Sequence, residues 1–198
     1  SFTILYAVIS GGTLLYKELE KKTIYNILAK SVSRSEFIFG KFCGMLFTAL
    51  ILLLVMAVGL VAFCFMLEGR IDPALLQAFP FIALQVFIIC AVTIFFSAIT
   101  VTPLLSGTFS FVVFFVGRSA SYLKLFMDSH RPDFVPEQLI VFIYWILPQL
   151  DRIDISNQSV YGHVVDIEHV LYSGLYSLGY SMIVLMISVI IFSRREFN

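Results

Sequence analysis

Long apolar runs alternate with short polar stretches along this chain. The five apolar runs cover residues 2–16, 37–67, 76–101, 103–116 and 170–192. A membrane-spanning helix needs about 20 predominantly apolar residues, and three of the runs exceed that length. The first run is shorter, so we expect it to continue upstream of Ser1. The pattern predicts an all-α, polytopic transmembrane helical bundle that forms one domain over residues 1–198.

The composition agrees with a membrane protein. Hydrophobic residues make up 60% of the 198 residues and charged residues 13%, whereas soluble domains have about 45–50% and about 25%. The formal net charge is zero, which argues against a nucleic-acid partner. The cysteines Cys43, Cys64 and Cys90 form no CxxC pair, and we expect them to be packing residues in the bundle.

The longest polar stretch near the start of the chain is residues 17–44, here called the polar island. Six of the thirteen basic residues fall in it: Lys17, Lys21, Lys22, Lys30, Arg34 and Lys41. Thr23, Ile24, Ile27 and Leu28 recur at helical spacing, which predicts a short amphipathic helix. The sequence Ser33-Arg34-Ser35-Glu36 has the form of a capping box. We therefore expect a new helix to start at Ser33 and to continue into the second apolar run.

Two sets of small or polar residues share a helix face within the apolar runs. Gly40, Gly44 and Thr48 are spaced four apart, which predicts close packing against another helix. Gln85, Thr93 and Ser97 also share a face. This second set either hydrogen-bonds to neighbouring helices or lines a polar pathway. Further along, Thr102-Pro103 is typical of an N-cap followed by proline at the first helical position.

Residues 118–169 are mixed in character and are predicted to form an external region. The apolar run Gln138–Leu147 has only ten residues, too few for a full span. We therefore expect a short re-entrant or interfacial helix, and Tyr144 and Trp145 suit a membrane interface. The polar residues after it are expected to lie in water.

Charge fixes the orientation of the predicted spans. With the polar island inside, the alternation of sides puts Arg194 and Arg195 inside and residues 68–73 and 118–169 outside. The outside segments then hold five basic residues against nine acidic ones. This distribution follows the positive-inside rule and predicts a cytoplasmic polar island.

The sequence shows no chemistry typical of an enzyme. It contains neither a Gly-rich phosphate loop nor an HExxH motif. His163, Asp166 and His169 are candidate metal ligands, but their spacing favours a solvated external face, so we expect no metal and no cofactor. The predicted spans have no charged residues at their centres. This argues against an ion-coupled carrier and suits a transporter powered by a separate subunit.

The polar island resembles a known family. Glu20-Lys21-Lys22-Thr23, Ile27-Leu28-Ala29-Lys30, Ser33-Arg34-Ser35-Glu36-Phe37 and Gly40-Lys41-Phe42-Cys43-Gly44 resemble the permeases of type-2 ATP-binding cassette exporters. Ser31 departs from that pattern, because proline is common at this position. Leu147-Pro148-Gln149-Leu150, Val160-Tyr161-Gly162 and the ending Phe192–Phe197 are similar to the subgroup linked to copper-enzyme maturation.

This resemblance implies a multi-pass, six-helix permease subunit in a bacterial or archaeal cytoplasmic membrane, with its first helix upstream of this chain. It implies a dimer with a second permease subunit and two cytoplasmic ATPase subunits that bind ATP and magnesium. Residues 17–36 would form the cytoplasmic coupling element. The resemblance assigns ATPase docking to Glu20, Thr23, Ile24, Ile27, Leu28, Lys30, Ser33 and Arg34.

Other interpretations remain open. The amphipathic helix in the polar island could simply lie on the membrane surface and satisfy the positive-inside rule. At the level of the whole chain, the alternatives are a non-transporting membrane scaffold or assembly factor, and an ion-coupled carrier.

Overall fold

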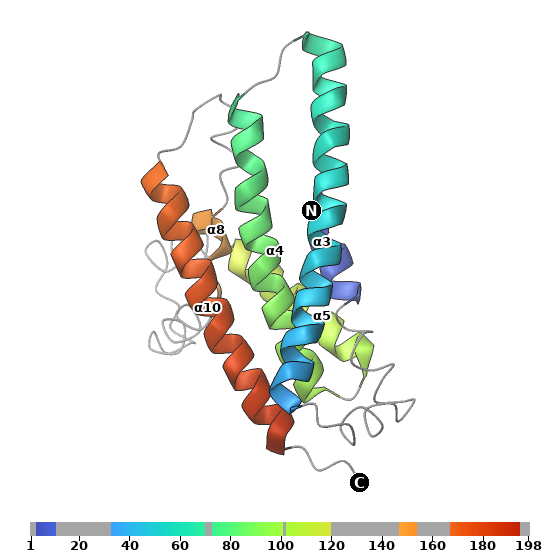
Figure 1. Ribbon diagram of the computed structural model, residues 1–198, viewed down its shortest axis with the longest axis vertical. Helices are drawn as coiled ribbons and strands as arrows, with labels where there is room; N and C mark the ends of the chain where they lie inside the picture. Colours follow the sequence, from blue (N-terminus) through green and yellow to red (C-terminus); the bar gives the residue numbers. More distant parts are fainter. Residues whose placement is uncertain are drawn as a thin grey trace, which may run out of the picture.

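The computed structural model is a bundle of α-helices (Figure 1). It describes residues 3–10, 33–69, 73–100, 102–119, 147–153 and 167–194. Residues 3–10 are helical, and the labelled helices are α3 (Arg34–Glu68), α4 (Pro73–Ile99), α5 (Pro103–Arg118), α8 (Leu150–Ile153) and α10 (Ile167–Arg194). Of these, α3, α4 and α10 are long and apolar enough to cross a membrane. The predicted all-α membrane bundle is therefore confirmed.

Helix α4 is the centre of the bundle and contacts α3, α5, α8 and α10. Its side chains Val86, Ile88 and Ile94 are fully buried. Figure 1 shows α4 between α3 and α10, with α3 running in the opposite direction to the other two. The Phe81 and His169 rings lie 5.9 Å apart at the end where α4 and α10 begin. The beginning of α3 consequently lies at the same end of the bundle as the end of α10.

The helix boundaries follow local signals in the sequence. Helix α3 ends at Gly69, which has a φ of 67°, a left-handed conformation that glycine adopts without steric cost. Thr102 and Pro103 occupy the predicted N-cap and first-turn positions of α5, although the Thr102 side chain makes no capping hydrogen bond. Helix α10 begins three residues before its apolar run, at Ile167.

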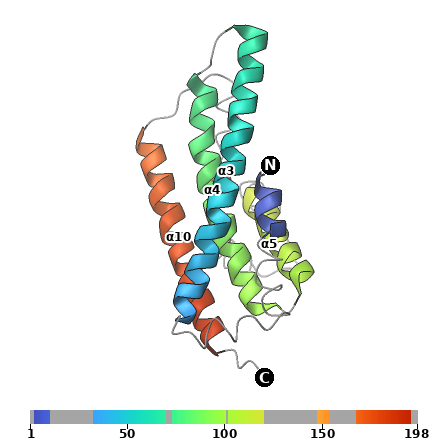
Figure 2. The ribbon, with the colours of Figure 1, turned by 45° about the vertical axis from the view of Figure 1, so that its right-hand side comes forward.

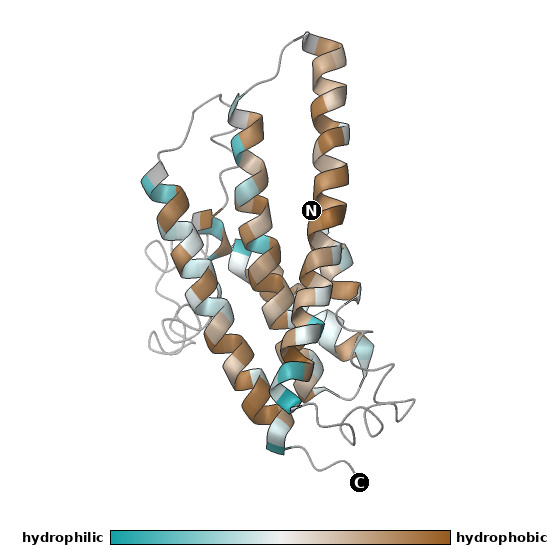
Figure 3. Ribbon diagram, viewed as in Figure 1, coloured by the Kyte–Doolittle hydropathy of each residue, from teal (hydrophilic) through white to brown (hydrophobic). Residues whose placement is uncertain are grey.

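The helices are apolar over much of their length, as the brown ribbons of Figure 3 show, and many of their large apolar side chains are exposed. Met66 is 85% exposed and Leu67 71% exposed near the end of α3. Soluble proteins rarely expose contiguous apolar surface of this extent, whereas lipid chains cover it without cost. The 35 residues of α3 span about 52 Å at 1.5 Å per residue. Helix α3 therefore exceeds a hydrocarbon core of about 30 Å and must tilt in it or extend beyond it.

The remaining described segments pack around α5. Residues 3–10 lie beside α5 in the turned view of Figure 2, and a Cβ added at Gly107 would be in ordinary van der Waals contact with the Val8 carbonyl oxygen, 3.9 Å away. At its other end, α5 contacts α8. Residues 120–146 and 154–166 lie outside the described part of the chain, so the interfacial helix expected at Gln138–Leu147 stays a prediction.

The contact between α5 and α8 depends on a glycine. A Cβ atom added at Gly117 would lie 2.5 Å from the Pro148 carbonyl oxygen and 3.3 Å from a Leu150 methyl carbon. Because the nearest atom belongs to the backbone, it cannot rotate away. Gly117 thus allows the chain at residues 148–150 to approach α5 closely.

We predict that Gly117→Ala destabilises the protein by about 1–3 kcal/mol, the usual cost of forcing extra volume into a packed site. Thermal unfolding in detergent measures this loss. Gly59→Ala is the matched control, because a Cβ there meets nothing within 4 Å. Equal melting temperatures for both variants would contradict the close contact.

Candidate functional site

The polar island ends at a well-formed helix cap. The Ser33 hydroxyl accepts a hydrogen bond from the Glu36 amide at 3.2 Å, and the Glu36 carboxylate accepts one from the Ser33 amide at 2.8 Å. This is the predicted capping box, which is confirmed. Two amides that lack partners within the helix are satisfied in this way. The cap fixes the direction in which the chain enters α3.

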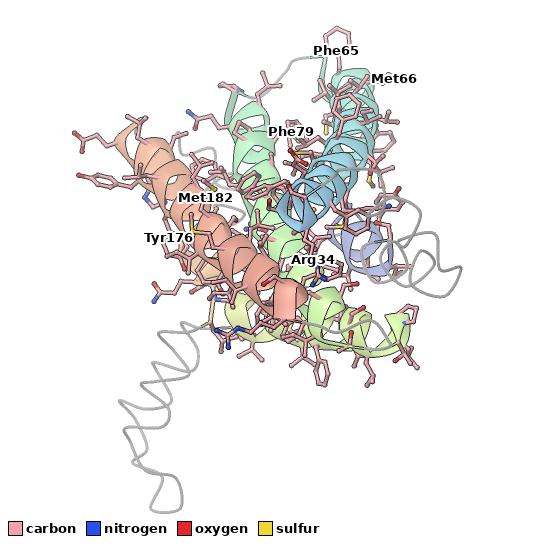
Figure 4. All side chains as sticks on the ribbon, turned by 60° about the horizontal axis from the view of Figure 1, so that its bottom comes forward. Arg34, Phe65, Met66, Phe79, Tyr176 and Met182 are labelled. Carbon is pink, nitrogen blue, oxygen red and sulfur yellow. The ribbon has the colours of Figure 1, made fainter. Side chains whose placement is uncertain are left out.

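Arg34 joins the start of α3 to the end of α10. Its Nη1 atom donates to the main-chain oxygens of Ser193 at 2.5 Å and Phe192 at 3.4 Å. These carbonyls belong to the last turn of α10, where carbonyl groups have no partner within the helix. A cation is also favoured there by the partial negative charge of a helix C-terminus. Figure 4 shows Arg34 close to the end of α10.

An aromatic contact lies one turn further along α3. The Phe37 and Phe192 rings are stacked, with centroids 5.9 Å apart and an interplanar angle of 16°. Phe37 is 8% exposed and Phe192 is fully buried. The Lys41 ammonium lies 5.8 Å from the Phe37 ring centroid, within the range of a cation–π contact. We call Arg34, Phe37, Phe192 and Ser193 the α3–α10 junction.

The residues predicted to dock an ATPase are only partly described. Glu20, Thr23, Ile24, Ile27, Leu28 and Lys30 lie outside the described residues. Ser33 caps α3, and Arg34 binds the end of α10. Their contacts with a partner protein stay a prediction.

The stripe of Gly40, Gly44 and Thr48 faces an open groove. A Cβ at either glycine meets nothing within 4 Å, and Thr48 donates to the carbonyls of its own helix. The groove has a volume of about 590 Å³, and Tyr6 and Ser10 also line it. The predicted packing of another helix on this stripe is not present among the described residues. The packing of another helix on this stripe stays a prediction, for a helix that lies outside the described residues.

Gln85, Thr93 and Ser97 are buried, with 3%, 0% and 4% of their surfaces exposed. The Thr93 hydroxyl donates to the Ile89 carbonyl of its own helix at 2.7 Å. This burial favours helix packing, and pathway lining stays a prediction. The neighbouring helix α10 buries a similar row of hydroxyl residues: Ser173, Ser177, Ser181 and Ser188. Within the described residues, the buried Ser181 hydroxyl has no hydrogen-bond partner.

The described residues contain no group of three or more His, Cys, Asp or Glu side chains that could hold a metal ion. Two of the three candidate ligands, His163 and Asp166, lie outside the described residues. The third, His169, is exposed and lies against Phe81. The predicted solvated face around His163 therefore stays untested.

Sequence reasoning missed the partner of Arg34. The side chain was assigned to docking because the sequence Ser33-Arg34-Ser35-Glu36-Phe37 resembles that of the family. The acceptors of Arg34 are main-chain carbonyls. Every residue has one, so the sequence does not indicate which carbonyls will accept a hydrogen bond. The one available signal was the aromatic pair itself, since Phe37 and Phe192 each lie at the border of an apolar run.

The fold and the site together define a multi-pass membrane protein with a polar segment leading into its longest helix. A family model described as ABC-2 family transporter protein matches residues 2–128. The chain belongs to this family, and the match includes the polar island and helices α3, α4 and α5. Proteins of this family are the membrane components of transporters and work with a cytoplasmic ATPase. No curated protein and no solved structure matches the chain.

We predict that Ser33→Ala weakens the start of α3 by about 0.5–2 kcal/mol, the usual cost of losing a helix cap. Hydrogen exchange in detergent should become faster at the Glu36 amide, which loses its acceptor. Glu36→Gln is the control, because glutamine also closes a capping box. Unchanged exchange at residue 36 in Ser33→Ala would show that the cap does not hold the helix start.

Proposed function

We propose that this chain is the permease subunit of an ATP-binding cassette exporter. It would couple ATP hydrolysis by a cytoplasmic partner to the export of a substrate across the membrane. The observation that carries the proposal is the family match over residues 2–128. The capping box at Ser33 supports it, because a helix that starts there would separate the proposed docking segment from the span that follows.

In this proposal residues 17–36 dock on the ATPase. The apolar face of Thr23, Ile24, Ile27 and Leu28 would fill a hydrophobic groove of the partner, as amphipathic helices do in many complexes. The partner would hold ATP and magnesium, so this chain would need no cofactor of its own. Closure of the ATPase pair would push the docked segment and move the helices that follow it.

The proposal includes a second permease subunit and a bacterial or archaeal cytoplasmic membrane. The exposed apolar face of α3 supports contact with lipid or with another membrane helix. A relation to the subgroup linked to copper-enzyme maturation is supported by Leu147-Pro148-Gln149-Leu150. Leu150 is fully buried, and Pro148 lies against Gly117, so these residues have a structural role near α5.

The described spans favour this function over an ion-coupled carrier. Helix α4, the most buried of the three spans, contains no charged residue. The charged residues of α10 lie in its first and last turns. Carriers coupled to ions or protons commonly place ionisable groups inside the membrane.

We predict that Ile24→Asp combined with Ile27→Asp releases the partner ATPase. Each buried aliphatic side chain contributes about 1.5–3 kcal/mol, so each substitution should raise the dissociation constant by about 10-fold or more. The measurement is the ratio of ATPase to permease after purification in detergent, together with the dissociation constant.

Asn26→Asp is the control, because residue 26 lies on the opposite face of the predicted helix and the substitution adds one carboxylate, as each of the two isoleucine substitutions does. It should leave the ATPase bound. Retention of the ATPase by the Ile24 and Ile27 variant would contradict docking through this face.

A further inference from the structure

We propose that Arg34 is a positioning residue that transmits movement of the docked segment to α10, the last described span. It would serve this purpose through the α3–α10 junction rather than by contact with the ATPase. The inference rests on the proposed function, because the movement begins when the ATPase pushes residues 17–36. It adds a second route, since the docked segment would then move α3 through the backbone and α10 through a side chain.

The position of Arg34 in the chain suits this role. It is the first residue of α3 and follows the Ser33 cap directly. The two hydrogen bonds of the capping box hold Ser33 and Glu36 on either side of it. A displacement of the docked segment would reach Arg34 through this capped turn, whose backbone is held by those two hydrogen bonds.

The side chain of Arg34 then makes a strong contact with α10. It donates to the carbonyls of Phe192 and Ser193. Hydrogen bonds from a charged donor are roughly twice as strong as neutral ones. The contact also joins the positive end of the α3 dipole to the negative end of the α10 dipole, which is a favourable arrangement.

The aromatic stack adds a second point of attachment. Phe37 lies one turn after Arg34, and its ring stacks on that of Phe192. Two contacts on different turns of α3 resist rotation as well as separation. The start of α3 and the end of α10 are therefore expected to move as one unit.

The contact between α10 and α4 has a different character. The hydroxyl groups of Ser177 and Ser188 donate to carbonyls of α10 itself, and that of Thr93 donates to a carbonyl of α4. These three bonds do not tie one helix to the other. Packed helices with small side chains between them can slide by small amounts. Because α10 packs more extensively on α4 than on α3, it would follow α3 by only a small slide against α4.

Distances between spin labels test this inference in the complex of the full chain with its copurified ATPase, reconstituted in liposomes. The labels replace Phe39 on α3, Ile190 on α10 and Ile99 on α4, which are all exposed, in a background without the three native cysteines. Each pair is measured with ADP and with ATP plus vanadate. We expect the 39–190 distance to stay constant between the two states and the 99–190 distance to change.

In Arg34→Gln we expect the 99–190 change to be lost, while α3 still moves against α4 and the 39–99 distance still changes between the two states. Arg34→Lys should restore part of the 99–190 change, because its ammonium group can still donate to a carbonyl. It also keeps the test usable if the glutamine variant does not fold. Arg194→Gln is the control, since it removes a positive charge from the same end of α10 and leaves Arg34 in place. It should behave as the wild type.

Two results would overturn the inference and leave the proposed function intact. One is a 99–190 change in Arg34→Gln as large as in the wild type. The other is release of the ATPase by Arg34→Gln, which would make Arg34 a docking residue. A wild-type chain that binds no ATPase would instead overturn the proposed function, and the inference with it.

Discussion

In a chain this apolar, every backbone polar group inside the bilayer needs a partner within the protein. Helices satisfy that requirement along their length but leave four amides and four carbonyls unpaired at their ends. The structure meets this need in different ways. Ser33 and Glu36 cap the start of α3, and the amide of Gly69 closes its end by donating to the Phe65 carbonyl. At the end of α10, Arg34 donates to the carbonyls of Phe192 and Ser193.

The contact between Arg34 and the end of α10 links structure to function. Because the donor comes from another helix, pairing the carbonyls of α10 also attaches α10 to α3. The attachment lies where the polar island enters the bundle, beside the segment that we propose to dock on the ATPase. Helix α4 packs centrally against both helices, with fully buried residues such as Ile88 and Thr93. Hydrogen bonds thus join α3 and α10 at one end of the bundle. Along its centre, the hydroxyl groups of Thr93, Ser177 and Ser188 bond within their own helices.

Sequence patterns predicted most of the fold, because membrane helices follow from apolar length and from local capping signals. The capping box at Ser33 and the proline start at Pro103 depend on neighbouring residues alone, so the sequence was enough to predict them. The roles of Arg34 and Gly117 were not predicted, because each depends on a main-chain carbonyl from a distant part of the chain. Gly40 and Gly44 line one groove, but a sequence cannot tell which helix would cover them, and the packing of a helix there stays a prediction.

The central claim is that the α3–α10 junction, which includes Ser193, lies at the cytoplasmic face of the membrane. Single cysteines at Thr102, Glu168 and Ser193, which are all exposed, test it most directly in a background without native cysteines. A membrane-impermeant thiol reagent is applied to right-side-out and to inside-out vesicles. We predict that positions 102 and 193 react only in inside-out vesicles and position 168 only in right-side-out vesicles. Reaction of positions 168 and 193 from the same side, or the reverse pattern, would contradict the account.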